Sequence, residues 1–229
     1  MSKVKNIVLV HGFWTDASCY SQIITTLLAE GYEAIAVQNP LTSLADDVAA
    51  TRRALARING KCILVGHSWG GMVITQAGND ERVCGLVYIA ALAPDIGESM
   101  IDLMSPYGKP SPHFQEQDGL IWLSKQGVEQ ILADDLSAEQ AALIYATQLP
   151  PSASLPSASS GSPAWINKPS WYIIANGDKA VSPDLQRKLS KRMGATTTVV
   201  ESSHVPIISH AKEVLDVIRE AAAHCSVSA

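Results

Sequence analysis

Short, continuously apolar runs alternate with segments of helical periodicity along the first part of the chain. Asn6–Val10 is too short for a helix and rich in β-branched residues, so we expect a strand buried on both faces. The segment from Asp16 to Glu30 instead carries apolar side chains at helical spacing, and Gly31 ends it. Further strands are expected at Glu33–Val37, Lys61–Val65 and Val83–Ala91, and further helices from Ser43 and over Met72–Gly78. This alternation predicts an α/β protein with a mostly parallel central sheet flanked by helices.

The alternation resumes near the C-terminal end of the chain. The elements expected there are a strand, a helix, a strand and a helix, at Trp171–Ala175, Ser182–Met193, Thr196–Val200 and Ala211–Ala223. Because the chain is short enough for one hydrophobic core, we predict a single α/β domain over residues 1–229, with a core of residues 1–94 and 169–229.

Between these two parts the alternation breaks, which predicts an inserted, mainly helical lid over about residues 95–168. Its expected elements are two short amphipathic pieces and one helix with a capping box, at Leu120–Lys125, at Glu129–Ala133 and from Ser137. The run from Leu149 to Pro163 has the composition of a linker between domains. We interpret it as the return loop of the lid, because too few residues follow it to form a second α/β domain.

Composition narrows the classes of function. The chain is 47% hydrophobic, which excludes wholesale disorder. With 22 acidic against 17 basic residues, its net charge of −5 argues against nucleic acid or an anionic membrane surface as a partner. No apolar stretch has the ~20 residues of a transmembrane helix, and the N-terminus lacks the features of a signal peptide. The four cysteines lack metal-ligand spacing, so we expect reduced thiols, no metal and a cytoplasmic location.

The segment Gly66-His67-Ser68-Trp69-Gly70-Gly71 lies between an expected strand and an expected helix. A G-x-S-x-G sequence at such a junction is typical of the nucleophile elbow, a tight turn that exposes a serine hydroxyl above the sheet edge. The glycines on either side are needed because a Cβ there would collide with a neighbouring strand or helix. The segment predicts Ser68 as a catalytic nucleophile, and an ordinary turn with an inert serine is the alternative.

A serine nucleophile of this kind needs an acid and a histidine later in the chain. Asp178 and His204 each follow an expected parallel strand, which places them at the same rim of the sheet as Ser68. His204 is therefore expected to take the proton of Ser68, and Asp178 to orient His204. Asp95 is the alternative acid. His210 is the alternative histidine, although its position at the start of a helix fits a surface or capping residue better.

The loop after the first strand is expected to complete the site. Gly12 lets the backbone turn so that the amide of Phe13 points to the space above Ser68. There it would form a two-donor oxyanion hole with the amide of Trp69. His11 is expected to hydrogen-bond the backbone of this loop rather than to act in catalysis.

With these residues in place, the chain resembles the α/β-hydrolase superfamily along nearly its whole length. It looks most like the small single-domain branch of plant methylesterases, hydroxynitrile lyases and their bacterial relatives. The matching segments are His11-Gly12, Gln38-Asn39-Pro40-Leu41, Gly66-His67-Ser68-Trp69-Gly70-Gly71, Gly177-Asp178-Lys179 and Ser203-His204. Lyases of this branch carry a threonine where this chain has Gly12 and a lysine where it has Val205. Both departures favour an esterase.

Large apolar side chains near the motifs indicate an apolar substrate. Beside Phe13 and Trp69, the candidate pocket residues are Trp14, Met100, Met104, Phe114 and Trp122. No cluster of Arg or Lys near the motifs marks an anionic group, so we expect a small or medium, largely apolar carboxylic ester. The resemblance implies hydrolysis through an acyl-enzyme without a metal or organic cofactor. A carbon–carbon hydrolase or lyase, a perhydrolase-like enzyme and a hydrolase-fold receptor for a small ligand remain alternatives. The oligomeric state stays open, with a homodimer as one alternative.

Overall fold

The described part of the chain is built on a six-stranded sheet in the order β2-β1-β3-β4-β7-β8, in which every neighbouring pair is parallel. The structure, a computed structural model, describes residues 4–225, so the ends of the expected domain, 1–3 and 226–229, lie outside the described residues. The strands are β1 (Asn6–Val10), β2 (Glu33–Val37), β3 (Cys62–His67), β4 (Val83–Ile89), β7 (Ser170–Ala175) and β8 (Thr196–Val200). Each matches a strand expected from an apolar run, and no end differs by more than two residues.

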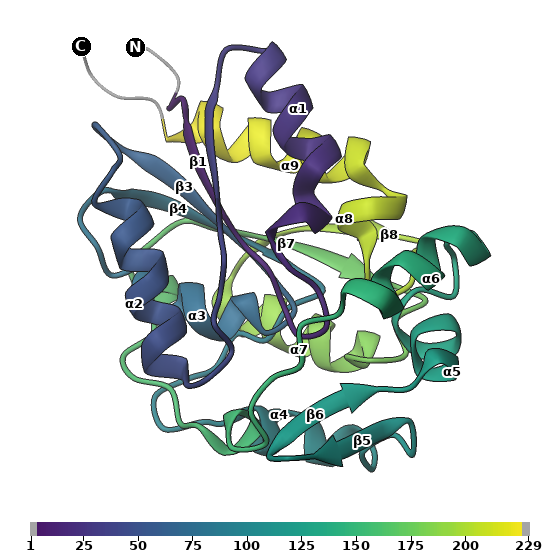
Figure 1. Cartoon of the computed structure of the whole chain (residues 1–229). Coiled ribbons are helices and arrows are strands. Elements are labelled where there is room, and N and C mark those ends of the chain that lie inside the picture. Colours follow the sequence, from purple (N-terminus) through teal and green to yellow (C-terminus); the bar gives the residue numbers. More distant parts are fainter. Residues whose placement is uncertain (1–3, 226–229) are drawn as a thin grey trace.

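Helices cover both faces of this sheet (Figure 1). One face is covered by α1 (Ser21–Ala29) and α9 (Ala211–His224), and the other by α2 (Leu44–Leu55), α3 (Gly70–Ala77) and α7 (Pro183–Met193). Because both faces are covered, the central strands β3 and β7 are buried along their whole length. The expected architecture, a parallel central sheet with helices on both sides, is confirmed.

The ends of the helices follow the sequence signals with small differences. The side chain of Ser43 accepts a hydrogen bond from the amide of Asp46 and caps α2 as expected. The reciprocal bond of a capping box is replaced by one from the Ser43 hydroxyl to the Asp46 carboxylate. In the insertion, Ser137 and Gln140 form the complete capping box at the start of α6 (Ala138–Thr147). A short helix that the sequence analysis does not predict, α8 (Pro206–Ser209), precedes α9.

The insertion between β4 and β7 is built mainly of short helices, as expected, and also contains a hairpin that the sequence does not predict. Its helices are α4 (Met100–Met104), α5 (Lys125–Gly127) and α6, with short 3₁₀ and π turns, and the hairpin pairs β5 (Phe114–Gln117) with β6 (Leu120–Leu123) in antiparallel fashion. The amphipathic piece expected at Leu120–Lys125 therefore begins as a strand of this hairpin. Asp118 and Gly119 form the two-residue turn with positive φ angles of 53° and 75°, and Asp-Gly is a sequence signal for such a hairpin.

The arrangement of the sheet decides where the loops meet. Since all six strands are parallel, the loops that follow β1, β3, β7 and β8 emerge at one edge of the sheet. In Figure 1 the insertion, coloured teal to green, lies beside this edge. No helix within residues 4–225 is long and apolar enough to cross a membrane.

Two buried histidines lie at this edge, directly after β1 and at the end of β3. The Nδ1 atom of His11 donates to the carbonyl oxygen of Gly12 at 2.8 Å, and its Nε2 accepts from the amide of Asn39 at 3.0 Å. The Nε2 atom of His67 donates to the carbonyl oxygen of His204 at 2.7 Å. His11 therefore bonds loop backbone as expected. Burial, together with the neighbouring His204, lowers the pKa of His67 to about 3.

A stability prediction follows from the buried His67. In the unfolded chain its pKa returns to about 6.5, so below that pH protons bind the unfolded state first and stability falls as pH decreases. In His67→Gln this contribution is absent, and an amide can still donate to the His204 carbonyl. Between pH 7 and pH 4.5 we expect the free energy of unfolding of the wild type to drop by about 3 kcal/mol more than that of the variant. Urea unfolding at both pH values measures this, and parallel losses in the two proteins would show that His67 is not held neutral.

Candidate active site

Ser68 occupies the tight turn between β3 and α3. Its backbone lies in the left-handed region, with φ of 54°, which is uncommon for a residue other than glycine. A Cβ on Gly66 would lie 2.6 Å from the carbonyl oxygen of Gly70, and a Cβ on Gly70 would lie 2.3 Å from that of Val10. These approaches leave no room for a side chain, so the two glycines allow the sharp turn that the motif predicts.

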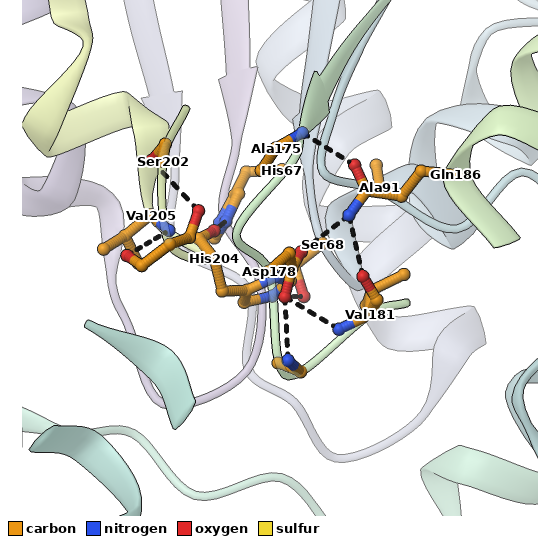
Figure 2. A network of polar contacts seen from close by, with 12 residues as sticks. His67, Ser68, Ala91, Ala175, Asp178, Val181, Gln186, Ser202, His204 and Val205 are labelled. Carbon is orange, nitrogen blue, oxygen red and sulfur yellow. Dashed lines mark hydrogen bonds and ion pairs between the residues drawn. The ribbon is translucent and has the colours of Figure 1, made fainter. Parts of the chain in front are cut away.

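Three side chains from different loops form one chain of hydrogen bonds (Figure 2). The Oγ atom of Ser68 lies 2.7 Å from Nε2 of His204, and Nδ1 of His204 lies 2.7 Å from Oδ2 of Asp178. All three are buried, with Ser68 the most accessible at 9% exposure. With a carboxylate as its partner, Nδ1 carries the hydrogen, and Nε2 is free to accept the hydrogen of the Ser68 hydroxyl. The three residues expected to act together therefore lie together.

The carboxylate of Asp178 is surrounded by donors. The amides of Ala180 and Val181 donate to Oδ1 at 2.8 and 2.9 Å, and Nε2 of Gln186 donates to Oδ2 at 2.7 Å. Gln186 is fully buried on α7 and also accepts from the amide of Ala175 at 3.0 Å. These contacts hold the carboxylate in place beside His204. Gln186 cannot be recognised from the sequence, because a glutamine in an amphipathic helix carries no local signal of this contact.

The alternative acid and histidine are engaged elsewhere. Asp95 bonds within its own turn, where its carboxylate accepts from the amide of Ile96 and its amide donates to Glu98. His210 directly precedes α9 and contacts the hydroxyl of Ser209 at 2.9 Å. Neither residue forms a hydrogen bond with His204 or Ser68 within the described residues. The geometry therefore favours Asp178 and His204.

The loop after β1 approaches the serine closely. A Cβ on Gly12 would lie 2.6 Å from the Cβ of Ser68 and 3.0 Å from its Oγ, so only glycine fits. The rings of Phe13 and Trp69 stack with centroids 4.8 Å apart and an interplanar angle of 22°. Among residues 4–225, the protein offers no acceptor to the amide of Phe13 or to that of Trp69. The two amides expected to form the oxyanion hole thus belong to residues that pack on each other.

A buried carboxylate lies beneath this pair of rings. Asp47, on α2, is fully buried, and its Oδ2 accepts a hydrogen bond from the indole Nε1 of Trp69 at 2.8 Å. Its Oδ1 accepts from the amide of Leu41 at 2.9 Å. Burial raises the pKa of Asp47 to about 6, although both hydrogen bonds oppose the shift. The sequence analysis misses Asp47, since an acidic residue in the first turn of a helix is ordinary there.

The candidate pocket residues fall into different surroundings. Trp14 is buried, packs against Phe114 of the hairpin with centroids 5.0 Å apart, and donates from its indole to the carbonyl oxygen of Ile121 at 2.8 Å. Met100 and Met104 are half-buried and pack against the core. Trp122, on the hairpin strand β6, is 37% exposed. Whether any of these residues contacts substrate stays a prediction.

A cavity of about 350 Å³ lies beside Trp14. Its walls come from the segment 14–22, from α6 and from α8. Trp14, Ile144 and Ile207 are among the residues that line it. The lining includes none of Ser68, His204 and Asp178, so the cavity lies beside the site rather than over the serine. For that reason we do not assign it to the substrate.

The insertion contacts the loops that carry His204 and Asp178. Ser203, next to His204, donates from its amide to Asp135 at 3.0 Å, and its hydroxyl donates to the same carboxylate. Partial burial favours the neutral form of Asp135, but the hydrogen bonds from Ser203 lower its pKa overall. Lys179, next to Asp178, forms an ion pair with Asp134. Two adjacent residues of the insertion, Asp134 and Asp135, therefore contact the residues next to Asp178 and His204.

The His, Cys, Asp and Glu side chains of the described residues are not gathered as metal ligands. Within residues 4–225, no group of three or more His, Cys, Asp or Glu side chains is arranged to hold a metal ion. The cysteines at positions 19, 62, 84 and 225 are all free thiols. The groups that the site brings together are a serine hydroxyl, an imidazole and a carboxylate.

Several known proteins with similar sequences are named as hydrolases. The alpha/beta hydrolase nvfD of Aspergillus novofumigatus is 27% identical over 94% of this chain and 96% of its own length. A pyrethroid hydrolase of Sphingobium wenxiniae is also 27% identical, over 95% of this chain and 87% of its own. The names of such relatives support the expected class of enzyme, a carboxylic ester hydrolase.

Solved structures and the family profile agree on the fold. Polyneuridine aldehyde esterase superposes with a TM-score of 0.80 at 20% identity, over 96% of this chain and 99% of that one. The methylesterase MES16 from Arabidopsis superposes with a TM-score of 0.76 at 20% identity, over 95% and 98%. The profile of the alpha/beta hydrolase family matches residues 7–217. The chain therefore belongs to the alpha/beta hydrolase family, as its motifs predict.

Proposed function

We propose that this protein hydrolyses a small or medium, largely apolar carboxylic ester, with Ser68 as the nucleophile. The observation that carries the proposal is the continuous hydrogen-bonded chain from Ser68 through His204 to Asp178. In the first step His204 accepts the Ser68 proton while Oγ attacks the ester carbonyl. The alcohol then leaves with the proton from His204, and Ser68 retains the acyl group. Water, deprotonated by His204, releases the acid and restores the hydroxyl.

The amides of Phe13 and Trp69 are the proposed donors to the tetrahedral oxyanion. Both adjoin glycine-dependent turns at Ser68, and neither has an acceptor among the described residues. Trp69 also stands at the start of α3, whose first amides point toward developing negative charge. Donors held in place before the reaction stabilise the transition state without reorganising, and one such donor is commonly worth about 10²–10³ in kcat.

Two positions favour ester hydrolysis over cyanohydrin cleavage. At Gly12 a side chain larger than hydrogen would meet Ser68 at 2.6 Å, so the threonine typical of the lyases has no space in this arrangement. Val205, where the lyases carry a lysine, is fully buried and supplies no positive charge to a leaving cyanide. The esterase names among the relatives, including pyrethroid hydrolase and polyneuridine aldehyde esterase, support the same reaction class.

We further propose that residues 95–168 act as a lid that braces the site within a single domain. The carbonyl oxygens of Leu149 and Ile121 both accept hydrogen bonds from Trp14, next to Phe13. Asp135 holds the loop before His204. A lid tied in this way would position the loops that carry Phe13 and His204.

Hydrolysis of a panel of short p-nitrophenyl esters by the wild type and by Ser68→Ala tests the proposal. We expect Ser68→Ala to lose at least 10³-fold in kcat, since removing the nucleophile leaves only binding and oxyanion stabilisation. Circular dichroism of the variant controls for folding. Equal rates in the two proteins would refute the mechanism, and cleavage of a cyanohydrin or a carbon–carbon substrate in preference to esters would favour the lyase alternatives. Ligand binding without turnover would favour a receptor.

The contact between Asp135 and Ser203 predicts that Asp135→Ala slows the same hydrolysis. Loss of its contacts to Ser203 frees the loop that carries His204, so we expect kcat to fall about tenfold, because small displacements of catalytic groups are costly. Asp134→Ala is the matched control, because it removes only a solvent-accessible ion pair to Lys179 and should change kcat much less. Equal effects of the two substitutions would contradict a specific role for Asp135.

A further inference from the structure

We propose that Asp47 is a positioning residue for the oxyanion hole, acting through the indole of Trp69. The inference rests on the proposed function, because it assigns to Asp47 the placement of donors used in that reaction. Asp47 does not touch the reacting atoms. It lies on α2, in a different part of the chain from the three catalytic side chains.

The contact between Asp47 and Trp69 is short and fully enclosed. Oδ2 of Asp47 lies 2.8 Å from the indole Nε1 of Trp69, and both side chains are at most 1% exposed. A hydrogen bond to a charged group is stronger than one between neutral groups, and burial removes competition from water. The orientation of the Trp69 ring is therefore set by α2 and not by packing alone.

The ring of Trp69 passes this constraint to the second donor. Trp69 and Phe13 stack with centroids 4.8 Å apart, and these are the two residues whose amides are proposed to bind the oxyanion. A rotation of the indole would have to move the Phe13 ring or open a gap between the rings. One carboxylate thus restrains both sides of the hole, although its only direct polar contact there is with Trp69.

The other oxygen of Asp47 is used as well. Oδ1 accepts from the amide of Leu41, a residue with a positive φ of 55°. The preceding Asn39 donates from its side chain to the carbonyl oxygen of His11 at 2.9 Å, directly before Gly12. The Gln38–Leu41 segment noted in the sequence therefore lies between Asp47 and the loop that carries Phe13.

A carboxylate suits this position better than the matching amide. Its two oxygens accept from two donors at once, whereas the amide group of asparagine offers one acceptor oxygen and an NH₂ group. In Asp47→Asn, either Trp69 or Leu41 would face a second donor. Transfer of an isolated carboxylate into a protein interior is unfavourable. The full burial of Asp47 is therefore explained by its hydrogen bonds to Trp69 and Leu41, which offset part of that cost.

The experiment compares three variants in the Ser68-dependent hydrolysis of a p-nitrophenyl ester. Asp47→Asn removes one acceptor, and Trp69→Phe keeps an aromatic ring and the backbone amide but replaces the indole with a smaller ring that has no N–H. Asp46→Asn is the matched control, since the same chemical change is made at the adjacent residue of the same helix, where Asp46 is exposed and bonds Ser43. We expect kcat to fall about 10- to 100-fold in the first two variants. This fall should not exceed the fall in kcat caused by removing one oxyanion donor. KM should change less than about threefold, because ground-state binding does not use the hole.

A second readout separates positioning from general loss of structure. A trifluoromethyl ketone adds to Ser68 and places an oxyanion in the hole, so its inhibition constant should rise in parallel with the fall in kcat. If Asp47→Asn does not fold, Trp69→Phe decides the matter on its own. Wild-type kcat in Trp69→Phe, an equal loss in Asp46→Asn, or a rise in KM without a loss of kcat would each overturn the assignment. Failure of the proposed function is distinct, because Ser68→Ala would then hydrolyse the ester as fast as the wild type.

Discussion

The close approach of backbone segments around Ser68 is the constraint on which the rest of the site depends. Gly66, Gly70 and Gly12 each bring the chain so near to a neighbour that a Cβ would fall between 2.3 and 2.6 Å from another atom. This packing holds Ser68 in a left-handed conformation with φ of 54°. The strain is tolerated because β3 and α3 are buried on both sides of the turn. Once the turn is formed, the hydroxyl and the amide of Trp69 have fixed places at the edge of the sheet.

The second requirement is that the buried imidazole of His204 and the buried carboxylate of Asp178 are held by hydrogen bonds. His204 is bonded on both ring nitrogens and also accepts at its carbonyl oxygen from His67. Asp178 receives its hydrogen bonds from the loop after β7 and from Gln186 on α7. These partners come from segments far apart in the chain, so the site forms only when the complete sheet has formed. The lid adds contacts to the same loops through Asp135.

The sequence predicts the fold and the three central residues because their signals are local. An apolar run, a glycine-flanked serine and an acid or histidine after a strand can each be recognised within about ten residues. Parallel pairing then brings the strand ends to one edge, which is a general property of such sheets. The proposed role of the loop after β1 rests on a signal of the same kind, the glycine at position 12 directly after the first strand.

What the sequence does not predict depends on distant contacts. Asp47 and Asp135 are ordinary acidic residues by position, and only the folded chain places one beneath Trp69 and the other beside Ser203. Gln186 is missed for the same reason. The hairpin in the lid is a different case. Its turn, Asp118-Gly119, is a recognisable local signal. The four-residue strands on either side are too short to show a clear period, so the sequence does not predict them.

The most direct test of the account is the site of reaction with a fluorophosphonate, which forms a stable adduct with an activated serine. Peptide mass spectrometry should place one adduct on the peptide that contains Ser68, and ester turnover should fall in proportion to the labelled fraction. In His204→Ala the labelling should be slow, since the hydroxyl is no longer activated. Full ester turnover by protein that is completely labelled at Ser68, or loss of turnover with the adduct on another residue, would contradict the account.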